Sequence, residues 1–185
     1  MIAWLPEQAA ALAHRGNEEL TMAKVVERSS WSALYETDFH AWAEKQAELL
    51  RARRFDELDL AHLIEEVADL ATYQRHSVVS RARRILQHFL KLEFSPASEP
   101  RRGWKETIVT QRTDLEERLT ASLRQELAGA LADTYGRARR DAVRDLKQDQ
   151  VSERDLPVAC PYTLEQVLDA DWLPANVHGI KDPQR

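Results

Sequence analysis

The chain has 185 residues, of which 43% are hydrophobic and 31% are charged, and its net charge is −5 at pH 7. This length supports one domain with a hydrophobic core, while the acidic balance gives no bulk attraction to nucleic acid or acidic lipid. A single cysteine, Cys160, excludes an internal disulfide and is typical of a reducing cytosol. No apolar run reaches the roughly 20 residues of a membrane-spanning helix, and the N-terminus lacks a secretory signal pattern. We therefore expect a soluble cytoplasmic protein.

The composition predicts helices rather than strands. Alanine, leucine, glutamate, arginine and glutamine dominate, and the chain contains 5 glycines. We interpret residues 1–30 as a peripheral N-terminal extension. Within it, residues 6–15 predict a short helix with Pro6 in the first turn and Gly16 just beyond its end, and Met22 is a second candidate for the translation start.

The next predicted helix covers residues 38–53, with Asp38 as its N-cap. One stripe of this helix carries Phe39, Trp42, Ala43, Gln46 and Leu50. A short connection at residues 55–57 follows, and a connection of this length makes two helices antiparallel neighbours.

Residues 59–92 are the stretch around which the chain is organised. Neither glycine nor proline interrupts it, and apolar residues recur at helical spacing: Leu60, Leu63, Ile64, Val67, Leu70, Ala71, Val78, Ala82, Ile85, Leu86, Phe89 and Leu90. Asp59 precedes them as a predicted N-cap. We expect the polar residues 72–77 to continue the helix, because neither proline nor glycine bends it there. An unbroken helix of this length reaches roughly 50 Å, and we expect the other helices to pack along it.

The second half of the chain predicts two more helices. A loop rich in proline at residues 95–103 precedes a third helix at 104–121. A fourth helix at 122–149 starts with Ser122 and Gln125, which match the capping-box pattern.

The pattern of the fourth helix ends in an extended arm at residues 151–161, followed by one or two helical turns at 162–168 with Thr163 as N-cap. We expect three residues to pin the arm to the helices: Tyr162, Leu168 and Trp172. Residues 175–185 are predicted to be a loose tail. The predicted fold is therefore all-α, a bundle of four principal helices with one long central helix and an extended C-terminal arm, formed by a single domain at residues 31–174.

Four segments of the chain resemble a known family. LYETDFHAWAEKQAELLRARRFDELDLAHLIEEV resembles its opening, HFLKLEF and RRGWKETIVTQR its middle, and CPYTLEQVLDADWLP its closing signature. The matching residues are Tyr35, Asp38, Phe39, Trp42, Asp59, Leu60, Leu63, Glu65, Glu66, His88, Leu90, Lys91, Trp104, Ile108, Gln111, Arg112, Cys160, Pro161, Tyr162 and Leu164. Leu92 replaces the aromatic residue that often follows Lys91 in the family. This family of cyanobacteria and proteobacteria is catalogued as domain of unknown function 29. The resemblance covers residues 32–174 and implies an all-helical domain with no assigned activity.

Acidic residues near the start of the long helix are the first candidates for chemistry. His62 and Glu66 are four residues apart and point the same way, as a metal site requires. The Glu-x-x-His pattern of di-iron bundles does not occur in the sequence, so we favour a solvated face and predict neither metal nor cofactor. For Glu65 or Glu66 we favour an ion pair with an arginine of a neighbouring helix, Arg112 being the candidate, over a catalytic role.

Two further residues are candidates for catalysis, His88 as a general base and Cys160 as a nucleophile. His88 lies beside Phe89 in the apolar half of the long helix, and we favour a core histidine with a hydrogen bond over a general base. Ser77 and Ser80 lie near it in sequence but carry no Gly-x-Ser-x-Gly motif. Cys160 fits a small packing residue better than a nucleophile.

The tetrapeptide Arg-Ala-Arg-Arg occurs three times, at residues 51–54, 81–84 and 137–140, at unequal intervals and with acidic residues close by. We favour a solvated, partly salt-bridged surface. The functional alternative is a ridge that binds the phosphates of nucleic acid, formed by Arg81, Arg84, Lys91, Arg101, Arg102 and Lys105. Trp104 beside this ridge would stack a base, although a core position at the start of its helix is the favoured role.

No phosphate-binding glycine loop, cysteine pair or dinucleotide fingerprint occurs in the sequence. The favoured function is a non-enzymatic helical module that binds another protein or a second copy of itself, because the long amphipathic helix has apolar residues on more than one side. One alternative is a nucleic-acid-associated protein that uses the arginine and lysine ridge. The other is an enzyme with a cleft formed by Glu65, Glu66, His88 and Arg112. Together with Trp104, these residues form the candidate functional cluster.

Overall fold

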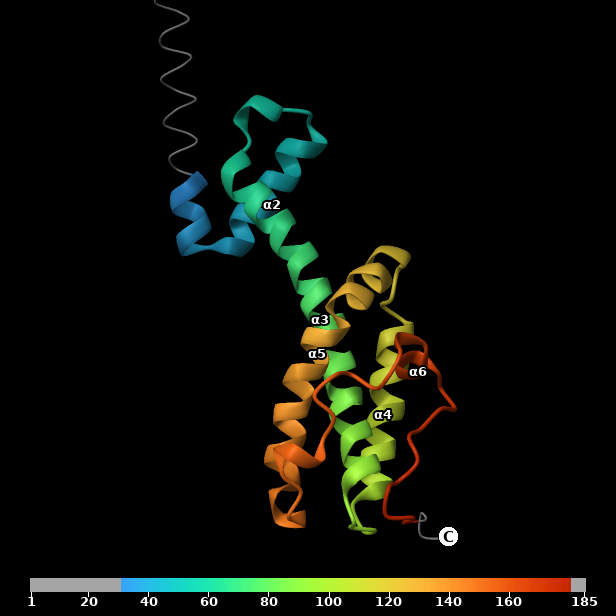
Figure 1. Cartoon of the computed structure of the whole chain (residues 1–185). Helices are drawn as coiled ribbons and strands as arrows, with labels where there is room; N and C mark the ends of the chain where they lie inside the picture. The colour runs from blue at the N-terminus through green and yellow to red at the C-terminus, as the bar shows by residue number, and fades with distance from the viewer. Residues whose placement is uncertain (1–30, 181–185) are drawn as a thin grey trace, which may run out of the picture. The chain divides into compact units, whose positions relative to one another are not determined.

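The computed structural model describes residues 31–180, and this range contains helices and no strand (Figure 1). The predicted all-α class is confirmed. The helix expected at residues 6–15 and the last residues of the predicted tail lie outside the described range. The chain divides into two compact units, Met1–Asp69 and Leu70–Arg185. Within residues 31–180, no helix is both long and apolar enough to cross a membrane.

Within residues 31–69, the described part of the first unit, the chain forms short helices and the start of the long one. Residues 31–37 are helical and lead into α2 (Phe39–Arg51). Asp38 is the N-cap of α2 as predicted, since its side chain accepts a hydrogen bond of 3.0 Å from the Ala41 N–H. At the other end, Arg53 has a left-handed φ of 57°, and this turn ends α2 two residues earlier than predicted. A 3₁₀ turn, η1 (Phe55–Glu57), then connects to the next helix.

The long central helix, α3, spans Leu60–Phe94 and is 35 residues long. It runs without interruption through residues 72–77, so the predicted continuity is confirmed. The segment contains neither proline nor glycine, the residues that most often kink or interrupt a helix, and this explains its continuity. The helix ends two residues later than predicted and is followed by a loop at residues 95–100.

The two halves of α3 differ in burial. Apolar residues of the second half are fully or almost fully buried, among them Val78, Ala82, Ile85, Leu86, Phe89, Leu90 and Leu92. Those of the first half are not: Leu60, Ile64, Val67 and Leu70 are each more than half exposed. The expected burial of the apolar residues of α3 is therefore confirmed for its second half and wrong for its first half.

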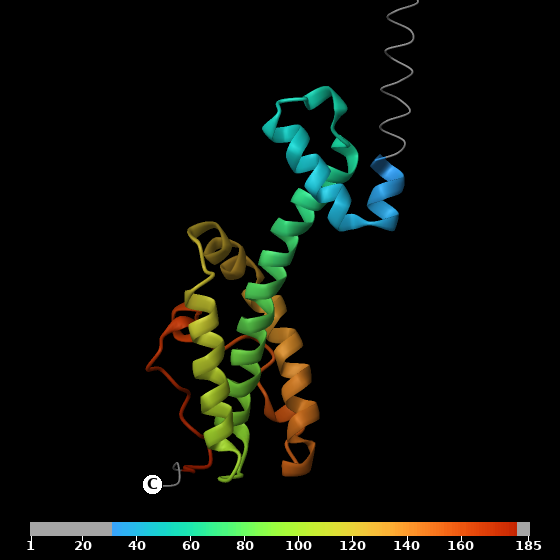
Figure 2. The ribbon, with the colours of Figure 1, turned by 180° about the vertical axis from the view of Figure 1, so that it is seen from behind.

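In the second unit, the second half of α3 lies between α4 (Arg101–Glu116) and α5 (Ala121–Asp145), as both views show (Figures 1 and 2). The predicted start of α4 at residue 104 is wrong, because Pro100 already occupies the N-cap position. The predicted capping box of Ser122 and Gln125 is also wrong. Thr120 is the N-cap of α5, and its extended backbone separates α5 from the end of α4.

The arm after α5 contains short helical turns. The 3₁₀ segments η2 (Leu146–Asp149) and η3 (Glu153–Asp155) precede α6 (Leu164–Leu168). Thr163 is the N-cap of α6 as predicted, and its capping box is completed by Gln166. The arm returns along α3 and places α6 against α4 (Figure 2).

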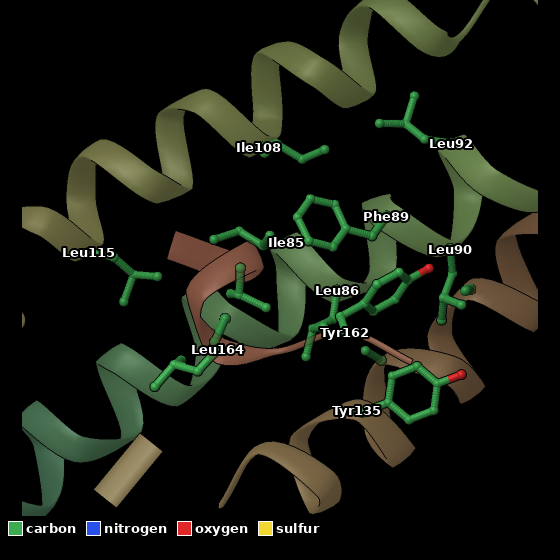
Figure 3. Packing of buried hydrophobic residues seen from close by; sticks show 14 of the residues in the cluster. Ile85, Leu86, Phe89, Leu90, Leu92, Ile108, Leu115, Tyr135, Tyr162 and Leu164 are labelled. Atoms are coloured by element: carbon green, nitrogen blue, oxygen red, sulfur yellow. The ribbon is translucent and has the colours of Figure 1, made fainter. Parts of the chain in front are cut away.

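The main core is formed by the second half of α3, α4, α5 and the arm (Figure 3). Phe89 is its centre, with its ring 5.2 Å from the rings of both Tyr162 and Trp172. Leu168 packs against the same cluster, so the predicted pinning of the arm is confirmed. The four predicted principal helices are present as α2, α3, α4 and α5. The buried residues of α2 lie in the first unit and are not part of this cluster.

Part of the predicted tail is held by the end of α3. The side-chain amide of Asn176 donates hydrogen bonds to the carbonyl oxygens of Leu92, Glu93 and Ser95, at 2.8, 3.1 and 2.9 Å. These carbonyls lie at the C-terminus of α3, where backbone acceptors lack partners within the helix. Asn176 therefore caps the long helix from a position more than 80 residues further along the chain.

Candidate functional site

A buried carboxylate organises the first unit. Asp59 is 6% exposed, and its Oδ2 lies 2.7 Å from Nδ1 of His62 and accepts a hydrogen bond of 3.3 Å from Nε1 of Trp42. The backbone N–H of Asp59 donates to Oε1 of Gln46, at 2.9 Å. The acidic residue expected as a helix cap thus connects α2 to the first turn of α3.

The ring of Tyr35 covers the same histidine. It stacks on His62 with ring centroids 4.0 Å apart and an interplanar angle of 23°. The phenol O–H donates to Oε1 of Glu66 at 2.7 Å. This hydrogen bond, which the anionic form of the phenol cannot donate, is the main reason that the pKa of Tyr35 rises to about 12.

These contacts partly cover His62 and Glu66 on the polar side of α3 and leave its apolar side exposed. At about 100° per residue, His62 and Glu66 lie on one side of the helix and Leu60, Ile64 and Val67 on the opposite side. The three aliphatic side chains are 56%, 68% and 65% exposed. Ala61 and Ala68, which flank them, are also exposed. We call these five residues the apolar stripe.

The imidazole and carboxylate pair does not form a catalytic triad among the described residues. Within residues 31–180, no serine, threonine or cysteine side chain is hydrogen-bonded to His62. No group of three or more histidine, cysteine, aspartate or glutamate side chains with metal-binding geometry occurs in this range. Through Asp59, the pair also contacts Trp42 of α2.

Arg112 has a structural partner that the sequence did not suggest. Its guanidinium donates to the carbonyl oxygens of Gln166, Val167 and Trp172 at 2.8, 3.0 and 2.9 Å, and to that of Ala170 at 3.3 Å. It also lies over the ring of Phe89, 5.2 Å from the centroid. The predicted ion pair of Glu65 or Glu66 with Arg112 is wrong. Arg112 satisfies the carbonyls at the end of α6, and Glu66 accepts from Tyr35.

His88 and Trp104 occupy buried positions in the second unit. His88 is 7% exposed, and its Nδ1 has no hydrogen-bond partner within the described residues. The predicted hydrogen bond at that atom is therefore absent. Burial is the main cause that lowers the pKa of His88 to about 4, and the positive charges of Lys91 and Arg84 add to it. Trp104 is 9% exposed in the core, as favoured, and carries Lys91 over its ring at 5.0 Å.

The five residues of the predicted functional cluster are divided between the two units. Glu65 and Glu66 belong to the first unit, while His88, Trp104 and Arg112 belong to the second, where the guanidinium of Arg112 is committed to carbonyls. A catalytic role for them stays a prediction. Cys160 is half-buried, and burial raises the pKa of its thiol, which fits the predicted packing role.

Most cations of the predicted ridge have a partner within the protein. Arg81 pairs with Asp114 at 3.3 Å, Lys91 with Asp145 at 3.0 Å, and Arg102 with Glu106 at 2.9 Å. Arg101 is buried and donates to the Leu92 carbonyl, and Lys105 also has a partner. Arg84 donates to the side-chain oxygen of Gln87. A continuous ridge of unpaired charge is therefore not formed, and nucleic-acid binding by these residues stays a prediction.

The sequence did not predict two of the contacts in the first unit, one between helices and one at the start of α3. The contact of Tyr35 with Glu66 joins residues 31 positions apart, so spacing along one helix gives no sign of it. The contact of Asp59 with His62 has a local signal, since the two residues are three positions apart.

An all-α domain with one long central helix and a C-terminal arm is the class of protein that these elements define. The model of the family described as Domain of unknown function DUF29 matches residues 34–173, and the chain belongs to this family. The resemblance found in the sequence is thereby confirmed. The chain matches no curated protein and no solved structure. Tyr35, Trp42, Asp59 and Glu66, which carry the family's opening pattern, are the residues that form the hydrogen bonds between the start of α3 and the preceding helices.

Proposed function

We propose that the protein is a helical interaction module that pairs with a second copy of itself through the apolar stripe. The observation that carries this proposal is the inverted burial of the first half of α3. His62 and Glu66 face inward, while Leu60, Ile64 and Val67 are each more than half exposed. An exposed aliphatic face is favourable when a partner removes it from water.

The charge distribution favours a second copy over a charged partner. No charged residue lies within the arc of α3 that Leu60, Ile64 and Val67 occupy, and the flanking positions are Ala61 and Ala68. In a two-fold dimer each residue of the interface faces the same surface of its copy, so a charged stripe would repel itself. This stripe has no such repulsion, and its alanines let two helices approach closely.

The energy available from the stripe is sufficient for association. Burial of an aliphatic side chain of this size contributes roughly 1.5–3 kcal/mol, so three of them on each protomer provide a substantial favourable term. Loss of rotational and translational freedom on association opposes it. We therefore expect a dimer that dissociates on dilution rather than a permanent one.

A charge placed in the stripe tests this proposal. We expect sedimentation equilibrium of the full chain to give the mass of a dimer at micromolar concentration. The Val67→Glu variant should be monomeric, because two buried glutamates would meet at the interface, and the dissociation constant should rise by about tenfold or more.

Val109→Glu is the matched control. Val109 also lies on a helix and is 58% exposed, against 65% for Val67, but it belongs to α4. This variant should remain dimeric. A monomeric wild type, or equal dissociation of both variants, would contradict the proposal. Circular dichroism should give the same helix content for all three proteins, because glutamate is a good helix former.

We further infer that the protein works in the cytoplasm. The support is the single cysteine of the sequence, whose half-buried thiol forms no disulfide. Fractionation of the native cells with an antibody against the protein should recover it in the cytoplasmic fraction. Recovery from the periplasm or the medium would refute this inference.

A further inference from the structure

A polar cavity lies in the second unit, away from the arm. Its volume is about 430 Å³, and every lining residue is polar: Ser80, Arg83, Arg84, Gln87, Gln111, Asp141 and Arg144. These residues come from α3, α4 and α5. At about 100° per residue, Ser80, Arg84 and Gln87 face away from Phe89, the residue on which the arm packs.

The cavity has an excess of positive charge although the protein is acidic overall. Three guanidinium groups line it, and Asp141 is the one carboxylate among the lining residues. Asp141 is 7% exposed. It accepts from Nε of Arg83 at 2.6 Å and from Arg144 at 3.0 Å, so it holds one arginine of α3 and one of α5 in place.

Arg84 keeps its charge available. Its N–H donates to Oε1 of Gln87 at 3.2 Å, and it has no carboxylate partner within the described residues. Gln87 is itself 4% exposed and fixed from behind, since its Nε2 donates to Asp145 at 2.8 Å. Asp145 is in turn paired with Lys91 and so does not neutralise Arg84. The guanidinium of Arg84 is thus oriented by a neutral amide.

We propose that this cavity binds a small phosphate-bearing anion. Arg84, together with the N–H groups of Arg144 that do not bond to Asp141, supplies the donors that match phosphate oxygens, while Ser80 and Gln111 add neutral hydrogen bonds at the margin. Arg83 stays with Asp141 and contributes its charge at a distance. A volume of this size holds a molecule of metabolite size rather than a length of nucleic acid.

Calorimetric titration of the full chain with inorganic pyrophosphate at low salt tests this site. We expect one saturable site per chain. Arg84→Gln and Arg144→Gln should each weaken binding by about tenfold or more, because each removes a charged donor. Arg102→Gln is the matched control: it removes the same charge from an exposed arginine of α4 that does not line the cavity, and binding should stay within about twofold.

Three results would overturn the proposal. They are no binding by the wild type at millimolar pyrophosphate, equal weakening in all three variants, and tighter binding of a single-stranded oligonucleotide with the same dependence on Arg84. The last result would assign the surface to nucleic acid.

Arginine side-chain resonances of the folded wild type provide a second measurement that needs no variant. Those of Arg84 and Arg144 should shift on addition of pyrophosphate and that of Arg102 should not.

Discussion

Several arginine and polar side chains stabilise this protein through backbone carbonyls rather than through carboxylates. Arg112 donates hydrogen bonds to carbonyl oxygens at the end of α6, and Arg101 donates to the carbonyl oxygen of Leu92. Asn176 donates to carbonyl oxygens at the end of α3. Each supplies donors to acceptors that a helix end leaves without partners. The sequence shows which residues are charged, but these acceptors become visible only when the chain is folded. For this reason the sequence predicted an ion pair of Arg112 with a glutamate instead.

Arg112→Lys should destabilise the protein although it preserves the charge. A lysine ammonium cannot reach carbonyls spread over residues 166–172, and at least two hydrogen bonds to a charged group are lost. We expect the free energy of unfolding in urea to fall by about 2–3 kcal/mol. Arg102→Lys, at a side chain that is 81% exposed, should change it by less than about 0.5 kcal/mol. Equal effects of the two variants would refute the structural role of Arg112.

His88 should make stability depend on pH. Its pKa is about 4 in the folded protein against an ordinary value of 6.5, so between these values the unfolded chain binds more protons. Stability therefore falls as the pH is lowered through this window, by roughly 3 kcal/mol in total for this group.

The His88→Gln variant isolates this contribution from the other histidines. It lacks the ionisable group at the same buried position, so its free energy of unfolding should decline less steeply between pH 6.5 and 4 than that of the wild type. Denaturant unfolding at several pH values measures the two curves. Parallel curves would show that His88 is not kept neutral by the fold.

At the scale of elements, sequence patterns predicted the helices well and their ends less well. The continuity of α3 followed from the absence of proline and glycine, and the caps Asp38 and Thr163 were correct. The start of α5 was missed because Thr120 and Ser122 are both good N-cap residues. The choice between them depends on where α4 turns, and that turn is set by packing.

The two candidate caps of α5 can be separated by alanine substitution. Thr120→Ala removes the side-chain oxygen that accepts from the Leu123 N–H, so the free energy of unfolding should fall by about 0.5–1 kcal/mol. Ser122→Ala changes a residue inside the helix, where alanine is favoured, and should be neutral or slightly stabilising. Urea unfolding of both variants measures this. A larger loss for Ser122→Ala would restore the cap predicted from the sequence.

Periodicity also could not decide which side of α3 is buried. It identified Leu60, Ile64 and Val67 as one apolar side, and the natural expectation was a core position. The partial cover of the opposite side depends on Tyr35 and Trp42, which come from other helices and pair with Glu66 and Asp59. A pattern within one helix does not contain these partners, so the candidate site was only partly predictable.

At the scale of the whole molecule, the second unit has a complete core, whereas the first unit presents an aliphatic face outward. The second unit encloses Phe89 and its neighbours between three helices and the arm. In the first unit, three large side chains of the apolar stripe remain in water. An unpaired chain bears an unfavourable free energy for this exposure, and pairing of two copies relieves it. Pairing through this face is therefore the central claim about the protein.

Disulfide cross-linking between copies tests that claim most directly. In a Cys160→Ser background, single cysteines are placed at Ile64, Val67 and Ala68, with Val109→Cys as the control on α4. A two-fold axis through the stripe brings at least one stripe position close to its own copy. Under mild oxidation at micromolar concentration we predict rapid covalent dimer formation at one or more stripe positions and little at position 109. Cross-linking no faster at any stripe position than at position 109 would contradict the account.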